Sequence, residues 1–200
     1  QSYLRHCVDV AVQVASPVVA GPMYSPVGRT WRLDDAERKE VIARVAQGLR
    51  PVADYAAQAG VGLAIEPLNR FETSLINTVE QALELVAAVD SPACGIALDT
   101  FHMNIEERDL GNAIRAAGSH LAHVQVCAND RGAPGADHLD WPAIASALAD
   151  VGYRGALCIE SFTAENQTIA TAASIWRPLA RSQDAIATDG LAFLRQVLAG

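Results

Sequence analysis

The chain has 200 residues, of which 50% are hydrophobic and 19% are charged, and its formal net charge is −8 at pH 7. This length suits one domain with one substantial core, and so large an apolar fraction excludes intrinsic disorder. An acidic balance disfavours binding to a phosphate backbone, so we expect no nucleic-acid partner. No apolar run approaches the ~20 residues needed to cross a bilayer, so we expect no membrane partner.

Four cysteines without a CxxC spacing lie in apolar segments: Cys7, Cys94, Cys127 and Cys158. This usage is typical of a cytoplasmic protein whose thiols stay reduced. The chain begins at Gln1 with a segment that already reads as a helix, and no signal-peptide pattern precedes it. We therefore predict a single cytoplasmic domain over residues 1–200 that starts partway through its fold.

Helical and strand-like segments alternate along the whole chain. In chain order we expect helix Tyr3–Ala15, the short run Pro17–Pro22, helix Asp34–Gln58, strand Val61–Pro67, a helix opening at Thr78, strand Cys94–Thr100, helix Leu110–Gly118, strand Leu121–Cys127, helix Trp141–Val151, strand Gly155–Phe162, a short strand Ser174–Trp176 and helix Asp184–Leu198. Such alternation predicts about six βα units around a parallel sheet.

Local signals mark several of these boundaries. Asp34 or Asp35 is a suitable N-cap for the long helix, and Thr78 with Gln81 forms the pattern of a capping box. Pro51 falls inside the long helix, which we expect it to kink or to split in two.

Four of the strand-like runs end on a polar side chain that faces the same way. They are GLAIE (Gly62–Glu66), GIALD (Gly95–Asp99), HVQ (His123–Gln125) and ALCIE (Ala156–Glu160). Because successive strand side chains face opposite sides, small residues and the final polar residue share one face, while large apolar residues take the other. This pattern is typical of a parallel barrel whose last inward residues build a metal or acid–base site. An open doubly wound sheet is the alternative, but no GxGxxG follows the first strand.

The four strand ends carry oxygen donors. Glu66, Asp99 and Glu160 are carboxylates, and Gln125 supplies an amide oxygen. Converging carboxylates raise one another's pKa values unless a cation joins them. Oxygen ligands suit Mn²⁺ or Mg²⁺ better than Zn²⁺. The sequence therefore predicts a divalent-metal site, with Mn²⁺ first and Mg²⁺ or Co²⁺ as alternatives. The competing interpretation is that each carboxylate merely caps a strand end or a loop.

Four motifs carry a resemblance to a known family. They are IEPLNRFET (Ile65–Thr73), LDTFHMNIEE (Leu98–Glu107), HVQVCANDRGAPG (His123–Gly135) and IESF (Ile159–Phe162). They resemble the sugar isomerase/epimerase superfamily with a xylose isomerase-like TIM barrel, and within it the ketose 3-epimerases of the D-tagatose/D-psicose type. The resemblance implies an α/β fold of the (β/α)8 type, of which about the first two βα units are expected to be missing here.

The resemblance also implies roles for individual residues. Glu66 and Glu160 match the pair of glutamates that bind the metal and exchange the substrate proton, and Asp99 matches another metal ligand. His102 and Arg131 match residues that hold substrate hydroxyls. Glu72 matches a further substrate contact. The expected partner is a small sugar, and the full-length form is expected to be a homo-oligomer, a dimer or a tetramer.

Two positions depart from the epimerase pattern. The fourth ligand in those enzymes is the second histidine of an HxH motif, where this chain has Gln125. A glutamine can still bind through its amide oxygen, as hydroxypyruvate isomerase-like relatives look to do. His123 faces the same side but lies ~7 Å deeper along the strand, too far to replace it. Ala128 stands where an acidic residue is common, which removes a partner that would orient the ligands.

The expected chemistry is proton transfer beside a carbonyl. If a second glutamate returns the proton to the same carbon, a ketose is epimerised at C3; if the proton returns to the neighbouring carbon, an aldose and a ketose interconvert. The sequence leaves both outcomes open, with a ketose 3-epimerase first and a hydroxypyruvate isomerase-like enzyme second. A third alternative is a non-catalytic fragment or binding module.

Overall fold

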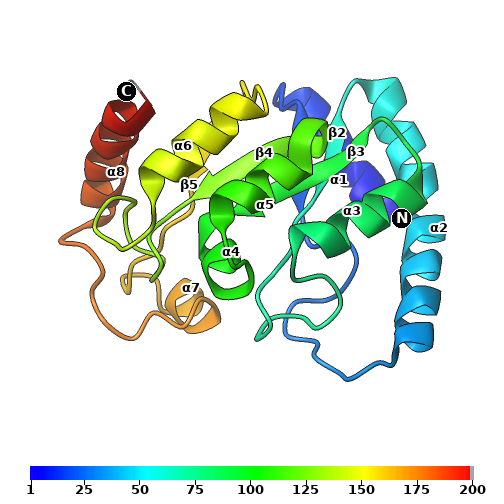
Figure 1. The fold of residues 1–200 in the computed structure, drawn as a ribbon, viewed down its shortest axis with the longest axis horizontal. Coiled ribbons are helices and arrows are strands. Elements are labelled where there is room, and N and C mark those ends of the chain that lie inside the picture. Colours follow the sequence, from blue (N-terminus) through cyan, green and yellow to red (C-terminus); the bar gives the residue numbers. More distant parts are fainter. Residues whose placement is uncertain (199–200) are drawn as a thin grey trace.

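The computed structural model describes residues 1–198, which form one parallel β-sheet with helices packed along its outer face (Figure 1). The strands are β1 (Val18–Gly21), β2 (Gly62–Ile65), β3 (Cys94–Asp99), β4 (Leu121–Val126) and β5 (Leu157–Ile159). They pair in sequence order, β1-β2-β3-β4-β5, and every pairing is parallel. The predicted parallel α/β sheet is thus confirmed, with five strands rather than six among the described residues.

Helices connect the strands and pack against one another along the outside of the sheet. They are α1 (Ser2–Gln13), α2 (Asp35–Ala59), α3 (Val79–Val89), α4 (Thr100–Glu106), α5 (Leu110–Ala117), α6 (Trp141–Asp150), α7 (Gln167–Ala172) and α8 (Gln183–Leu198), with a 3₁₀ turn at Gly118–His120. Contacts run from α1 to α2, α2 to α3, α3 to α5, α5 to α6 and α6 to α8. This succession of βα units is the arrangement of a (β/α)8 barrel, of which the described residues supply an open, curled part.

The sequence signals for α2 and α3 are present as predicted. Asp34 accepts hydrogen bonds from the backbone N–H groups of Ala36 and Glu37, and Thr78 with Gln81 closes the expected capping box. Pro51 was predicted to kink the long helix or to split it, and the structure excludes the split, because α2 continues through it. Val52 next to it is completely buried, so packing against the core offsets the one hydrogen bond that proline removes.

Three other expectations differ from the structure. Ser174–Trp176 is not a strand: Ser174 has φ 56°, and the Ile175 N–H bonds back to the Ala170 carbonyl at 2.8 Å, which closes α7. Helices α4 and α7 were not predicted. Each is short and begins with a side-chain cap, Asp99 for α4 and Asn166 for α7, which periodicity cannot reveal in so few residues.

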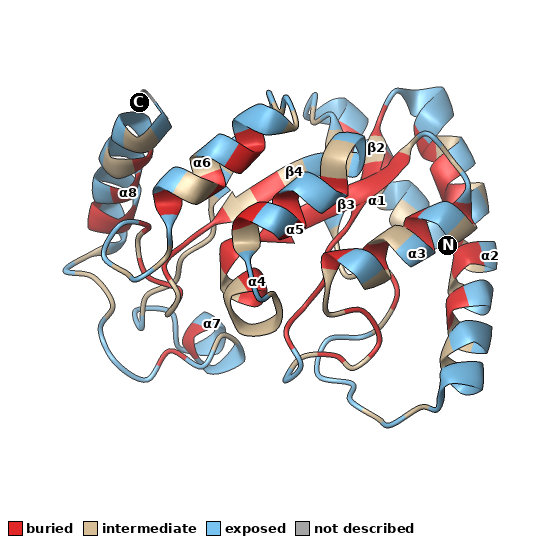
Figure 2. Cartoon of the chain, viewed as in Figure 1, coloured by how far each residue is buried: buried red, intermediate tan, exposed pale blue. Residues whose placement is uncertain are grey.

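The two faces of the sheet differ as the alternation predicts. Leu63, Ile65, Ile96, Leu98 and Val126 are at most 1% exposed and belong to one hydrophobic core with buried residues of the helices. Figure 2 shows buried residues along β3 and on parts of the helices. None of the helices within residues 1–198 is both long and apolar enough to span a bilayer.

The strands are staggered, so the polar strand ends do not share one register line. Asp99 lies opposite Gln125, but Gln125 lies opposite Cys158, two residues before Glu160. Ile65 lies opposite Ile96, which puts the next residue, Glu66, beside Ala97. The functional position therefore advances from β2 to β3 and again from β4 to β5, and it stays level from β3 to β4. Such offsets accompany the shear of a tilted barrel.

Candidate active site

The predicted residues meet at the carboxyl-terminal edge of the sheet. Glu66 follows β2, Asp99 ends β3, Gln125 lies near the end of β4 and Glu160 follows β5. In parallel barrels this edge is where catalytic side chains gather. Glu66 and Asp99 are 7% and 1% exposed, so both carboxyl groups are held away from bulk water.

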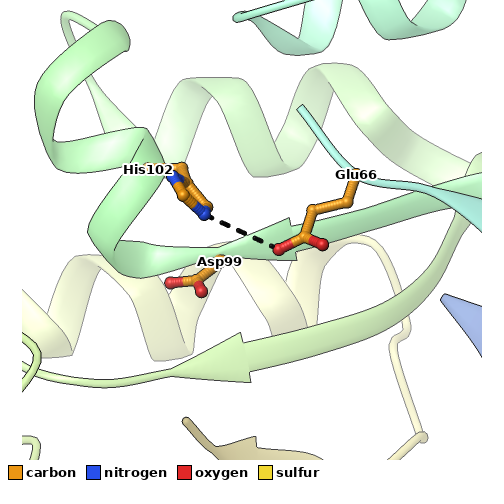
Figure 3. Close-up of side chains that lie close together, drawn as sticks. All are labelled: Glu66, Asp99 and His102. Atoms are coloured by element: carbon orange, nitrogen blue, oxygen red, sulfur yellow. Dashed lines mark ion pairs between the residues drawn. The ribbon is translucent and has the colours of Figure 1, made fainter. Parts of the chain in front are cut away.

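Glu66, Asp99 and His102 form the tightest cluster (Figure 3). One donor atom from each lies within 4.8 Å of the others, a spacing that could hold a metal ion. His102 sits in the first turn of α4, immediately beyond β3, and its Nε2 lies 3.8 Å from Glu66 Oε1. The resemblance assigned His102 to the substrate. The structure also places His102 close to the carboxylates of Glu66 and Asp99.

Arg131 reaches the same carboxylates from the loop after β4. Its Nη1 donates to Asp99 Oδ2 and lies 3.8 Å from Glu160 Oε2. The guanidinium stacks over Phe101, 4.3 Å from the ring centroid, and the residue has φ 70°. Burial alone would lower the pKa of Arg131, but Asp99, Cys127 and Glu160 raise it overall, so the side chain remains a cation.

The hydrogen bonding of Gln125 is consistent with a metal-binding role for its amide oxygen. Its Nε2 donates to Glu160 Oε2, so the amide oxygen is not engaged by that carboxylate. That oxygen, Oε1, is buried and has no hydrogen-bond partner among residues 1–198. A buried acceptor without a partner is costly, and a divalent cation bound at this oxygen would remove that cost. Three carboxylates and one amide oxygen match the preferences of Mn²⁺ and Mg²⁺.

The charges of the site raise the pKa values of both glutamates. Burial and the nearby Asp99 and Glu160 carboxylates raise the pKa of Glu66 to about 8. Burial and Asp99 raise the pKa of Glu160 to about 7. Burial lowers the pKa of His102, although Asp99 opposes this shift, which favours the neutral ring. Near neutral pH the metal-free site therefore holds both protonated and ionised carboxyl groups.

Glu72 joins the cluster through Asn69, a residue that the sequence reasoning missed. Asn69 Nδ2 donates to Glu72 Oε1 at 2.8 Å and lies 2.9 Å from His102 Nδ1. Asn69 is only 2% exposed. Asn69 comes three residues after Glu66, in the loop that leads from the strand to the next helix. That position was the only feature of the sequence that could have indicated a place near the site.

The adjacent glutamates Glu106 and Glu107 have structural roles. Glu106 accepts the backbone N–H of Arg70 at 2.7 Å and binds the Arg70 guanidinium, and Glu107 accepts the backbone N–H of Val79 at 2.8 Å. Helix α4 thereby holds the loop that carries Glu72. All seven predicted site residues lie in one connected group: Glu66, Glu72, Asp99, His102, Gln125, Arg131 and Glu160.

Comparison with known proteins places this geometry in a family. A family model described as a xylose isomerase-like TIM barrel matches residues 2–197. The chain belongs to this family. A "probable ketose 3-epimerase" of Synechocystis sp. is 40% identical over 195 residues, covering 98% of this chain and 67% of the relative. The D-psicose 3-epimerase of Ruminiclostridium cellulolyticum is 38% identical over 169 residues, covering 84% of this chain and 57% of the relative.

Solved structures agree with this family assignment. The crystal structure of D-psicose 3-epimerase with D-tagatose from Clostridium cellulolyticum has a TM-score of 0.90 at 33% identity, covering 98% of this chain and 70% of that one. The structure of an L-ribulose 3-epimerase gives a TM-score of 0.91 at 33% identity, covering 99% of this chain and 66% of that one. The chain thus spans 57% to 70% of the length of the relatives D-psicose 3-epimerase and L-ribulose 3-epimerase.

Proposed function

We propose that the chain carries the active site of a metal-dependent ketose 3-epimerase of the D-tagatose/D-psicose type. The observation that carries the proposal is that the buried Glu66 and the half-buried Glu160 lie in one group with Asp99, and their pKa values are raised to about 8 and about 7. A proton-transfer pair works best when its pKa values lie near the working pH, because one member can then accept a proton while the other donates.

The residues that would hold the ion are Glu66, Asp99, Gln125 and Glu160, and Mn²⁺ is the ion we expect, with Mg²⁺ or Co²⁺ as substitutes. When bound, a divalent ion polarises a carbonyl and its neighbouring hydroxyl and stabilises negative charge on their oxygens. Arg131 and His102 would orient further hydroxyl groups of the sugar. Glu72, which lies on the loop, would accept a hydrogen bond from one of them. One glutamate removes the proton from C3 and keeps it, and the other, protonated beforehand, donates its own proton to C3 from the opposite face, which inverts that carbon.

Incubation of the chain with Mn²⁺ and D-fructose, D-tagatose or D-psicose in D₂O tests the proposal. We expect the 3-epimer to form and deuterium to enter at C3, both detectable by NMR. Deuterium at the neighbouring carbon with an aldose product would indicate an isomerase instead. If the chain turns over no sugar and binds no metal ion, the epimerase proposal is wrong and the alternative of a non-catalytic binding module stands.

Gln125 favours one second candidate, an isomerase of hydroxypyruvate or a related small sugar. Its unpartnered amide oxygen stands where the epimerase pattern has a histidine nitrogen. A parallel assay with hydroxypyruvate separates the two functions, since turnover of hydroxypyruvate alone would overturn the epimerase proposal. For the full-length protein we also propose a homo-oligomer, a dimer or a tetramer, which light scattering after gel filtration would measure.

A further inference from the structure

Asn69 lies where three parts of the site meet, although no role in the proposed chemistry has been assigned to it. It follows β2 by a few residues and is 2% exposed. Its side chain contacts His102 from α4 and Glu72 from its own loop, and its backbone N–H also reaches His102. A buried amide with this many contacts determines which atoms of its neighbours remain free.

The orientation of the Asn69 amide is fixed by a backbone group. The N–H of Phe71 donates to Asn69 Oδ1 at 2.9 Å, and a backbone N–H can only donate. The oxygen must therefore face Phe71, so the NH₂ group faces the other way. Its two hydrogens point to Glu72 Oε1 at 2.8 Å and to His102 Nδ1 at 2.9 Å.

These donors determine the tautomer of His102. Nδ1 faces the Asn69 backbone N–H at 3.1 Å as well as the Asn69 NH₂ group, and both can only donate. Nδ1 is therefore an acceptor, and the hydrogen of the neutral ring sits on Nε2. Arg131 Nη2 lies 3.1 Å from Nε2, but two donors do not bond each other, so both groups are available to an oxygen placed between them.

We propose that Asn69 is a positioning residue that fixes the polarity of the substrate-facing groups. It makes His102 Nε2 a donor, and by holding Glu72 Oε1 it leaves the other carboxylate oxygen as an acceptor. A donor on His102 and an acceptor on Glu72 suit a ligand with more than one hydroxyl group, one accepting and one donating a hydrogen bond. Only the identity of the ligand as a polyol rests on the proposed function; the tautomer does not.

Long-range ¹H–¹⁵N spectra of the imidazole nitrogens test the tautomer in the metal-free, sugar-free chain. In the wild type we expect His102 to carry its hydrogen on Nε2. Asn69→Asp keeps the backbone N–H at 3.1 Å but replaces the nearer NH₂ donor by a charged acceptor, and the stronger hydrogen bond to that acceptor should draw the hydrogen to Nδ1. Asn69→Ala keeps the backbone N–H, so the wild-type tautomer should persist. A hydrogen on Nδ1 in the wild type would overturn the proposal, as would an Nε2–H ring that is unchanged in Asn69→Asp.

Asn77→Ser is the matched control. Asn77 stabilises the same loop by donating to the carbonyls of Leu68 and Thr73, at 2.7 Å and 3.0 Å, yet touches neither His102 nor Glu72. It should lower thermal stability while leaving the His102 spectrum unchanged. A tautomer change in this variant as well would mean that loop integrity, rather than Asn69, fixes the ring.

Kinetics with Mn²⁺ and a ketose give the second measurement. Asn69→Asp should lower kcat/KM about 10- to 100-fold, the range expected for hydrogen bonds to charged groups. Asn69→Ala should act mainly by raising KM, because it releases Glu72. Wild-type kinetics in both variants would overturn the proposal, whereas an inactive wild type would refute the proposed function and leave the tautomer result standing.

Discussion

At the scale of single residues, carboxylates of similar chemistry differ in burial, in pKa and in how firmly they are held. Glu66 and Glu160 are both glutamates beyond strand ends, but Glu66 is 7% exposed and its pKa rises further. Asp99 is tied to Arg131, caps α4 through the Phe101 N–H, and so is held in one orientation. Asp99 therefore suits a fixed ligand, and the glutamates suit proton transfer.

Glu160→Gln should abolish turnover while leaving the fold intact. The amide has the size of the carboxyl group but cannot accept a proton from carbon, and loss of such a group costs on the order of 10²- to 10⁴-fold in rate. Initial rates with D-tagatose and Mn²⁺, together with circular dichroism, measure the two effects. Glu165→Gln, on an exposed glutamate nearby, is the control. Retained activity in Glu160→Gln would remove this residue from the proton-transfer pair.

Gln125 should govern metal affinity. Gln125→His should retain or tighten binding of Mn²⁺ and favour Co²⁺, because imidazole is a stronger ligand than an amide oxygen for such ions. Gln125→Ala should weaken Mn²⁺ binding by about 10- to 100-fold, as loss of groups around a metal does. Calorimetric titration measures both. Equal affinity in the wild type and both variants would show that Gln125 does not bind the ion.

At the scale of secondary-structure elements, α4 acts as a clamp. It is a short helix, Thr100–Glu106, but it presents His102 to Asn69 at one point and Glu106 to Arg70 at another. Both contacts hold the loop between β2 and α3, on which Glu72 lies. Loop residues reach a precise position in this way when a rigid neighbour holds them.

Glu106→Ala should loosen this loop. The Arg70 N–H and guanidinium would lose their acceptor, so the loop should be held less firmly to α4. Hydrogen exchange at the Phe71, Glu72 and Thr73 amides should accelerate, while exchange in the sheet stays slow. Glu80→Ala, on an exposed residue of α3, should leave these amides unchanged. Unchanged exchange in Glu106→Ala would show that α4 does not hold the loop.

At the scale of the whole molecule, the buried carboxyl groups make stability depend on pH. The native pKa values of Glu66 and Glu160 are raised to about 8 and about 7, above those of the unfolded chain. Raised carboxyl pKa values contribute stability that is fully present below the unfolded pKa, near 4.5, and lost as pH rises through the native pKa.

The metal-free chain should therefore lose stability between about pH 4.5 and pH 8. A pKa difference of one corresponds to about 1.4 kcal/mol, so the two glutamates together correspond to a change of several kcal/mol. Urea unfolding across this range measures it, and Glu66→Gln should flatten the slope. Mn²⁺ should restore stability at pH 8 and release protons on binding, which calorimetry in two buffers detects. If the free energy of unfolding of the metal-free chain rises with pH over this range, the raised pKa values are contradicted.

Much of this arrangement could be predicted from sequence because strand alternation is strong in short buried strands. The faces of β2 and β3 and the positions of Glu66 and Asp99 follow from it directly. The clamp formed by α4 could not be foreseen, since Glu106 and Glu107 read as an ordinary polar face and their backbone partners are distant in sequence. Asn69 was missed for the same reason: its importance lies in hydrogen bonds to His102, which only the folded chain brings near.

The stagger of the strands has a consequence for how the site would respond to deformation. Since the site positions are offset between β2 and β3 and again between β4 and β5, no two neighbouring strands alone determine the separation of the two glutamates. That separation depends on how strongly the sheet curls. Flattening the sheet would draw Glu66 and Glu160 apart while every strand kept its own hydrogen bonds. The distance between the two glutamates therefore depends directly on the curvature of the sheet.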